Sequence, residues 1–236
     1  MHVRWYGHSA FALSGATSVF IDPFVPERVR AEFPRERFDY PAITGVEADL
    51  VLVTHEHIDH NGSEAITGKP FVVRGGCFET PVDEGIRLRH WDTPVGEVTG
   101  IPSDHGEGRG PNTIFAFTLD DVRVCHFGDF GQLELYPWQE QAIGRPDLLF
   151  IPVGGTYTID GKTAARFAKQ LAPQLVIPMH YRTSKVGWKD FDSRRAFIKE
   201  FASTATATAK LDTPAFNPEK HVRGDGEVTV LVPAWP

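Results

Sequence analysis

Short apolar runs of three to six residues recur along the chain and are separated by Gly, Pro, Asn or Asp. Such runs, rich in Val, Ile and Phe, are typical of β-strands bounded by turns. The runs 50–53, 148–151 and 175–177 are apolar at every position, which indicates central strands buried on both faces. The predicted strands are 2–6, 10–13, 18–21, 50–53, 71–73, 113–118, 122–126, 148–152, 175–178 and 228–232.

Helical periodicity appears in three segments between these strands. In one of them Ala164, Ala168 and Leu171 fall on a single face, and Asp160 stands where an N-cap is expected. Another contains Pro137, which interrupts its pattern and weakens it as a helix. The predicted helices are 133–143, 162–171 and 193–201.

Strands outnumber helices, and no boundary divides the chain. We therefore predict an α/β fold in one domain over residues 1–236, with sheet packed on sheet and helices outside. The repetitive segment 202–209 is interpreted as the end of a helix followed by a linker. The stretch 27–37 mixes Arg and Glu with apolar residues and is interpreted as a solvated face.

Charge and cysteine content limit the binding partners and the cellular compartment that we expect for the protein. The 236 residues include 24 Lys and Arg against 31 Asp and Glu, and the net charge of −7 argues against nucleic acid and anionic membranes as partners. Cys77 and Cys125 are too few for a disulfide scaffold and are interpreted as buried thiols. With no apolar run near ~20 residues and no secretory pattern at the start, we expect a cytoplasmic protein.

Three of the ten histidines fall within six residues, directly after the apolar run 50–53. In an extended segment residues two apart point the same way, so His55, His57 and Asp59 can converge on one side, whereas His60 must turn inward differently. A polar loop with satisfied histidines is the plainer interpretation. Crowded imidazolium rings would repel one another, however, and imidazole with carboxylate is a ligand set that zinc accepts. The cluster therefore predicts a metal site.

Three further candidates, His105, Asp129 and His180, each follow an apolar run. Loops at the ends of strands are where functional groups concentrate, although any one of these residues alone is typical of an ordinary loop. Four local ligands do not complete a site for two metals, so these three are candidates for the rest of the ligands.

The order of these motifs resembles the metallo-β-lactamase fold of metal-dependent hydrolases. The similarity is strongest to a branch that holds uncharacterised cytoplasmic hydrolases and ascorbate-6-phosphate lactonase-like proteins, and it covers nearly the whole chain. It implies an αββα sandwich of two mixed β-sheets with outer helices. The matching segments are Tyr6-Gly-His-Ser-Ala10, Ile21-Asp-Pro-Phe24, Thr54-His-Glu-His-Ile-Asp-His60, Phe127-Gly-Asp129, Ile151-Pro-Val-Gly-Gly155, Tyr157-Thr158 and Ile177-Pro-Met-His-Tyr181.

The resemblance also implies a ligand set around two divalent metal ions. Zinc is the default, and Mn²⁺ or Fe²⁺ would also fit mixed His and Asp ligands. His90 is an alternative to His105 within this set. His55, His57 and His105 would hold the first ion, Asp59, His60 and His180 would hold the second, and Asp129 would bridge them.

Two residues match positions beside the family's metal site. Asp22 would orient a ligand histidine, because a ligating imidazole needs an acceptor for its other nitrogen. The alternative for Asp22 is a turn residue before Pro23. His8 lies in the same matched region, and the alternative for it is a hydrogen-bonded structural histidine.

The implied activity is hydrolysis of a small ester, lactone or phosphoester by a hydroxide that bridges the two ions. Asp59 is the predicted catalytic residue, as a ligand that also accepts a hydrogen bond from the nucleophile. The glycine-rich stretch 106–110 is either a rim of the site, where Arg109 meets an anionic substrate, or a flexible loop. The donor of the leaving-group proton stays open among metal-bound water, Tyr157, Tyr181 and His8. The predicted substrate contacts are Thr156, Tyr157, Thr158 and Tyr181.

Other functions fit the motifs less well. Di-iron reductases of the same fold resemble H-x-E-x-D, whereas His57 stands at the middle position here. Ribonuclease Z shares HxHxDH, but the net charge of −7 and the lack of a tRNA-gripping insertion argue against a nuclease. A non-catalytic metal-binding protein stays an alternative, and the oligomeric state, including a homo-oligomer, stays open.

Overall fold

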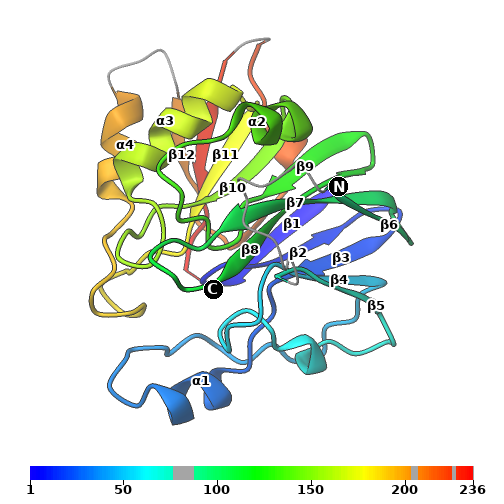
Figure 1. Ribbon diagram of the computed structural model, residues 1–236, viewed down its shortest axis with the longest axis vertical. Helices are drawn as coiled ribbons and strands as arrows, with labels where there is room; N and C mark the ends of the chain where they lie inside the picture. Colours follow the sequence, from blue (N-terminus) through cyan, green and yellow to red (C-terminus); the bar gives the residue numbers. More distant parts are fainter. Residues whose placement is uncertain (77–87, 203–206, 225–226, 236) are drawn as a thin grey trace.

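Two mixed β-sheets form the centre of the protein, as the computed structural model shows for residues 1–76, 88–202, 207–224 and 227–235 (Figure 1). Among these residues the first sheet has six strands in the order β13-β1-β2-β3-β4-β5, and the second has eight in the order β12-β14-β11-β10-β9-β8-β7-β6. The first sheet contains β1 (His2–Gly7), β2 (Ala10–Ser14), β3 (Ser18–Ile21), β4 (Leu50–Val53), β5 (Phe71–Arg74) and β13 (Ala215–Phe216). The second contains β6 (Arg89–Thr93), β7 (Gly96–Asp104), β8 (Pro111–Leu119), β9 (Val122–His126), β10 (Leu148–Pro152), β11 (Leu175–Met179), β12 (Ala207–Lys210) and β14 (Thr229–Val232).

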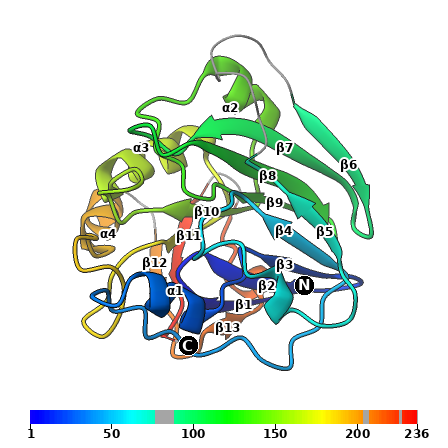
Figure 2. The same cartoon turned by 60° about the horizontal axis from the view of Figure 1, so that its bottom comes forward.

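Helices cover the outer sides of the two sheets, which confirms the predicted sandwich (Figure 2). The helices α2, α3 and α4 lie over the second sheet, and α1 lies on the side of the first. The α-helices are α1 (Pro26–Glu32), α2 (Pro137–Ile143), α3 (Gly161–Leu171) and α4 (Arg195–Ala202), and Ser63–Ala65 and Pro218–Lys220 form short 3₁₀ turns.

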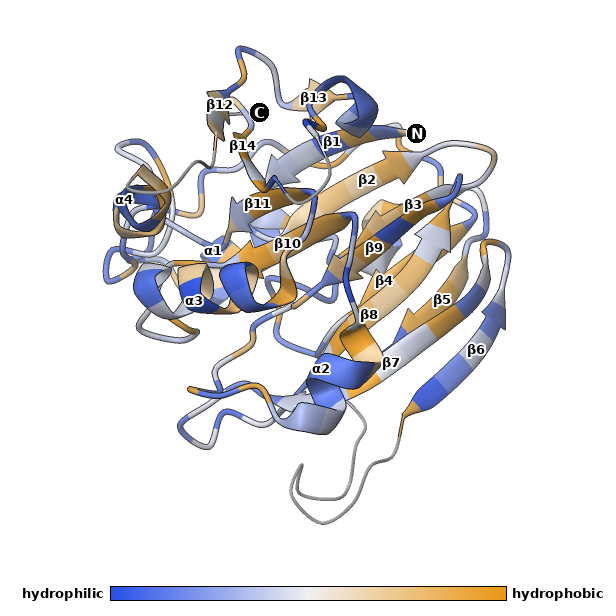
Figure 3. Cartoon of the chain, turned by 90° about the horizontal axis from the view of Figure 1, so that it is seen from above, coloured by the Kyte–Doolittle hydropathy of each residue, from blue (hydrophilic) through white to orange (hydrophobic). Residues whose placement is uncertain are grey.

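The apolar residues of facing strands meet between the sheets and form the main core. Every residue of β4, β10 and β11 is buried, as their unbroken apolar runs predict. By contrast β6 is a hydrophilic edge strand, visible in blue in Figure 3. Its polar sequence gives no strand signal, which explains why β6 is missing from the prediction.

The helix boundaries follow local chemistry. The Asp160 carboxylate accepts a hydrogen bond from the Thr163 N–H at 2.8 Å and caps α3 as predicted. The predicted helix 133–143 is shorter in the structure, because Pro137 begins α2 instead of interrupting it. Proline suits the first position of a helix, where its missing N–H leaves no bond unmade.

One prediction for an exposed segment needs correction and another is confirmed. Part of the expected linker 202–209 is strand β12, which pairs in parallel with β14, and residues 203–206 lie outside the described residues. The stretch 27–37 is mostly exposed, as expected of a solvated face, and its first part belongs to α1, which buries Val29. Cys125 is buried in β9, where burial raises the pKa of its thiol, and Cys77 lies outside the described residues. Within the described residues no helix is long and apolar enough to cross a membrane.

Candidate metal centre

The predicted ligands lie where the ends of several strands from both sheets meet. His55, His57, Asp59 and His60 follow β4 of the first sheet. His105, Asp129 and His180 follow β7, β9 and β11 of the second sheet. Two backbone bonds join the sheets beside the cluster, from Thr113 N–H to the Thr54 carbonyl at 3.0 Å and from His180 N–H to the His8 carbonyl at 3.3 Å. These bonds fix the loops of one sheet against those of the other.

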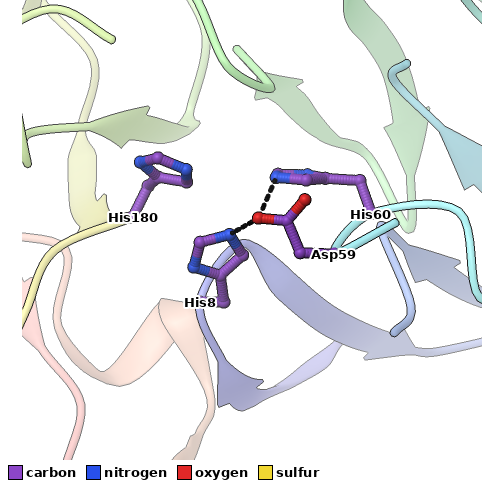
Figure 4. A group of neighbouring side chains, drawn as sticks. All are labelled: His8, Asp59, His60 and His180. Carbon is purple, nitrogen blue, oxygen red and sulfur yellow. Dashed lines mark hydrogen bonds and ion pairs between the residues drawn. The ribbon is translucent and has the colours of Figure 1, made fainter. Parts of the chain in front are cut away.

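All seven predicted ligands come together in three overlapping groups, and in each group the candidate ligand atoms lie within 4.8 Å of one another. Figure 4 shows the group that also takes in His8, with Asp59 linked to both His8 and His60. The groups are His55 with His57 and His105, His8 with Asp59, His60 and His180, and His55 with His60 and Asp129.

Asp129 stands at the centre of this arrangement. Its Oδ2 lies 3.0 Å from Nε2 of His180, 3.2 Å from Nε2 of His60 and of His105, and 3.7 Å from Nε2 of His55. It therefore contacts histidines from the predicted ligand sets of both metal ions. His90, the alternative to His105, lies on β6 and contacts Thr99 and Glu97 instead.

A buried carboxylate, Asp22, sets the orientation of two histidines. Its Oδ1 accepts the Thr54 N–H at 2.8 Å, and its Oδ2 accepts the Thr54 hydroxyl at 2.8 Å and His60 Nδ1 at 3.0 Å. Because the Thr54 hydroxyl donates to Asp22, it can only accept from His55 Nδ1, which lies 3.0 Å away. Both histidines thus carry a proton on Nδ1, so that Nε2 is left to face the centre. The contact with His60 is the one that the predicted orienting role of Asp22 requires.

The position of Asp129 depends on Asn112, a residue that the sequence analysis missed. Asn112 is buried on β8, and its Oδ1 accepts the Asp129 N–H at 3.0 Å. Its Nδ2 donates to the Phe127 carbonyl and to the Ser103 hydroxyl, both at 2.8 Å. Gly128 has a φ of +55°, and a Cβ there would lie 2.3 Å from Asn112 Oδ1. No local motif around Asn112 marks this contact, which only the pairing of β8 with β9 creates.

Three residues of the site adopt left-handed backbone conformations. The φ angles are +51° at His8, +47° at Asp22 and +52° at His180. Side chains with a Cβ rarely adopt this region, and each such residue costs roughly 1–3 kcal/mol. The surrounding bonds hold the three residues there. Such strain concentrates at functional sites, and here His8 and His180 belong to the ligand cluster while Asp22 contacts His60 from behind it.

The charges within the centre are strongly coupled. Burial alone would lower the pKa of His60, but the carboxylates of Asp129 and Asp59 outweigh it and raise that pKa well above its usual value. Burial would likewise raise the pKa of Asp129, yet His180 and His60 hold it well below its usual range. Burial, together with the charge of His180, lowers the pKa of His8 to about 4. His8 is therefore neutral at pH 7, and its Nε2 donates a hydrogen bond to Asp59 Oδ2 at 3.0 Å.

The donor set fits a divalent cation. Nε2 of His55, Nε2 of His60 and Oδ1 of Asp129 are buried and lack a hydrogen-bond partner among the described residues. Leaving such atoms unpaired costs about 1–3 kcal/mol each, and metal coordination would remove that cost. Imidazole nitrogens and carboxylate oxygens are the ligands that zinc and its neighbours take.

A pocket of about 310 Å³ opens over the cluster. His57, Asp59, His105, Asp129 and His180 contribute to its floor. The rim includes Glu32, Phe33 and Glu36 from α1 and the segment after it, and Ile58, Arg109, Tyr157, Trp188 and Phe191 from other loops. The α1 and Trp188 side of this rim was not predicted, because neither its acidic nor its apolar residues form a motif along the chain.

Among the predicted substrate contacts, only Tyr157 lines this pocket. The Thr156 hydroxyl donates to the Asp190 carbonyl, and the Thr158 hydroxyl donates to the Ile159 carbonyl. Tyr181 is buried against Trp5, with ring centroids 5.8 Å apart, and borders a different cavity. Arg109 does reach the rim, as one of the two interpretations of the loop 106–110 expects.

Comparison with known proteins gives matches over most of the chain. Residues 2–180 match the model of a β-lactamase superfamily domain. A UPF0173 metal-dependent hydrolase of Methanoregula boonei is 32% identical over 201 residues, which cover 78% of this chain and 83% of that protein. A second one, of Methanoculleus marisnigri, is 29% identical over 240 residues, covering 94% and 96% of the two chains. Among solved structures, a candidate Zn-dependent hydrolase of the metallo-β-lactamase superfamily from Thermotoga maritima has a TM-score of 0.71 and 27% identity, over 99% of each chain.

Proposed function

Because the chain belongs to the UPF0173 metal-dependent hydrolases of the metallo-β-lactamase superfamily, we propose that it hydrolyses a small ester, lactone or phosphoester at a centre of two divalent metal ions. The observation that carries the proposal is the convergence of two ligand groups on the single carboxylate of Asp129. Zinc is the proposed metal, since the donor set accepts it and the similar Thermotoga maritima protein is described as Zn-dependent.

The two ions would be held by the residues that the resemblance assigns. His55, His57 and His105 would hold one, Asp59, His60 and His180 would hold the other, and Asp129 would contact both. When bound, the ions supply Lewis acidity, which polarises a scissile carbonyl or phosphoryl group and acidifies water.

The protein's own residues orient this centre. Asp22 fixes the tautomers of His55 and His60, and Asn112 fixes the backbone of Asp129. His8 holds the Asp59 carboxylate from one side, while Asp59 also borders the pocket. We therefore infer that Asp59 accepts a hydrogen bond from the attacking water on its pocket side. His57 is exposed at the same pocket, so substrate reaches this part of the centre without a rearrangement.

The pocket sets the size and chemistry of the proposed substrate. A volume of about 310 Å³ is at the low end for ligand sites, which favours a small molecule over a polymer. Arg109 lies over the Tyr157 ring with its guanidinium carbon 4.7 Å from the centroid, and it pairs with Glu107 at 2.9 Å. A guanidinium held in this way suits a phosphate or carboxylate of the substrate. We infer a small anionic substrate with an apolar part against Trp188 and Phe191.

The test combines metal analysis of the purified protein with a hydrolysis screen. The screen uses p-nitrophenyl esters, bis-p-nitrophenyl phosphate and lactones. Replacing His57→Ala should lower metal content and turnover together. The matched control is His90→Ala, because His90 is a histidine of the same chain on the exposed edge strand β6. Unchanged turnover in the His57 variant, or fewer than two metal ions in active wild-type protein, would overturn the proposal.

A further inference from the structure

A second and larger cavity, of about 800 Å³, lies on the other side of the segment that carries His180. Tyr181 directly follows His180 and borders this cavity, whereas His180 borders the metal pocket. The two cavities have no lining residue in common. The second cavity is therefore a separate feature that the proposed hydrolysis does not use.

The lining of this cavity is strongly cationic in a chain whose net charge is −7. Five basic residues from several segments of the chain converge there, and Asp212 is the single acidic residue of the lining. The five are Arg182, Lys185, Arg194, Arg195 and Lys210.

Most of these cations lack a compensating charge. Over the described ranges of the chain, Arg182, Lys185, Arg195 and Lys210 make no ion pair with a carboxylate, although surface ion pairs occur elsewhere in the protein. Like charges gathered around a hollow repel one another and create a positive potential inside it. An exposed solvated face would account for cations spread over a convex surface, but these cations surround a cavity.

The floor of the cavity is aromatic and almost fully buried. Trp5 is 2% exposed and Tyr181 is 1% exposed, and the two rings stack at 5.8 Å. The Arg194 guanidinium carbon lies 5.3 Å from the centroid of Tyr181, which holds that cation in place. The aromatic floor is thus in place before a ligand enters, and the exposed side chains of the other basic residues stand around it.

We propose that this cavity binds a small polyanion that carries two or more phosphate groups. Arginine and lysine are the side chains that proteins use for phosphate, by bidentate pairing and by point charge respectively. A volume of about 800 Å³ exceeds the need of inorganic phosphate and is in the range of sites for whole small-molecule ligands. Pyrophosphate-like and nucleoside diphosphate ligands share this chemistry, and the experiment separates them.

The test is calorimetric titration of the metal-loaded protein with two probes that resist hydrolysis, methylene diphosphonate and α,β-methylene-ADP. Saturable binding is expected, and it should weaken as the salt concentration rises. A triple variant, Lys185→Ser with Arg195→Ser and Lys210→Ser, should bind at least about tenfold more weakly, because three charge-assisted contacts are lost. Tighter binding of the nucleotide probe than of the diphosphonate would identify the nucleoside as part of the ligand, and equal binding would identify the diphosphate alone.

Two controls locate the probe. Lys199→Ser removes an exposed cation of the same helix α4 outside the cavity lining, and it should leave binding unchanged. His57→Ala disturbs the metal pocket, where the metal ions offer the probes a second place to bind, and in this variant the binding that the triple variant weakens should persist. The proposal is overturned if neither probe binds the wild type at about 1 mM, if the triple variant binds like the wild type, or if the His57 variant binds neither probe. None of these outcomes depends on whether the protein hydrolyses a substrate.

Discussion

Replacing Asp22→Asn should lower metal affinity while it changes the free energy of unfolding only slightly. The variant keeps an oxygen that can accept the Thr54 N–H, but an NH₂ group replaces Oδ2, which in the wild type accepts from the Thr54 hydroxyl and from His60 Nδ1. That NH₂ group must donate, so His60 Nδ1 has to give up its proton and accept, which leaves the ring proton on Nε2. The Thr54 hydroxyl, now accepting from the introduced amide, donates to His55 Nδ1, and the proton of His55 moves to Nε2 as well. One substitution thus inverts both tautomers.

The sizes of the two effects, on unfolding free energy and on metal affinity, follow from the hydrogen bonds that change. The metal-free variant can satisfy all three hydrogen bonds in the inverted arrangement, so its unfolding free energy should stay within about 1–2 kcal/mol of the wild type. Metal binding needs both Nε2 atoms unprotonated and must break the new bonds. Loss of an orienting partner of this kind typically lowers metal affinity about 10–100-fold, which corresponds to about 1.4–2.7 kcal/mol.

The assay is zinc competition against a chromophoric chelator, together with thermal unfolding in the presence of EDTA. Asp49→Asn is the matched control, since the Asp49 carboxylate also accepts a backbone N–H and a hydroxyl, both from Ser18, at 2.8 Å and 2.7 Å. It has no histidine partner among the described residues, so its metal affinity should not change. Wild-type zinc affinity in the Asp22 variant would refute the assignment of tautomers.

Three further predictions concern the site. Zinc binding should release protons near pH 7, and zinc affinity should rise with pH. The reason is that Asp129 and Asp59 raise the pKa of His60 more than burial lowers it, and a bound cation must displace the His60 proton. Equal calorimetric heats of binding in buffers of different ionisation enthalpy would contradict this. Asn112→Ala should cost about 1–3 kcal/mol of unfolding free energy, measured by urea titration, because it leaves the Asp129 N–H without its acceptor. Trp188→Ala should raise KM more than it lowers kcat for any substrate found, because it removes part of the pocket wall and no proposed ligand.

The strands that the sequence predicts are those whose signal is local. The runs in β4, β10 and β11 are apolar throughout because both of their faces are covered, so their burial is readable from composition alone. The strand β6 is polar and exposed at an edge, and β7 contains Gly96, Gly100 and Pro102, residues that usually end a strand. Both strands exist because β8 pairs with β7 and β7 with β6, which is a tertiary cause.

The same distinction separates the proposed ligands from the residues that contact them from behind. Ligand types and their spacing are visible in the chain, because chemistry restricts them to His and Asp after apolar runs. The residues that contact these side chains from behind cannot be recognised in the sequence in this way. Asp22 reaches His60 across 38 positions, and Asn112 reaches Asp129 across 17. A resemblance to a known family placed Asp22 beside the site, but no motif pointed to Asn112.

The location of the centre between the sheets explains why its residues tolerate strain. His8 belongs to the turn between β1 and β2, and His180 follows β11 in the other sheet, yet the His180 N–H donates to the His8 carbonyl across the junction. Both residues have a positive φ, which neither would adopt in isolation. The packing of one sheet on the other holds them there, so the same core that stabilises the fold also keeps the candidate ligand atoms of Asp59 and His180 within 4.8 Å of each other. A cavity-forming substitution between the sheets, such as Phe11→Ala, should therefore lower metal affinity as well as stability. The control is Phe201→Ala on α4, which is remote from this junction and should lower stability alone.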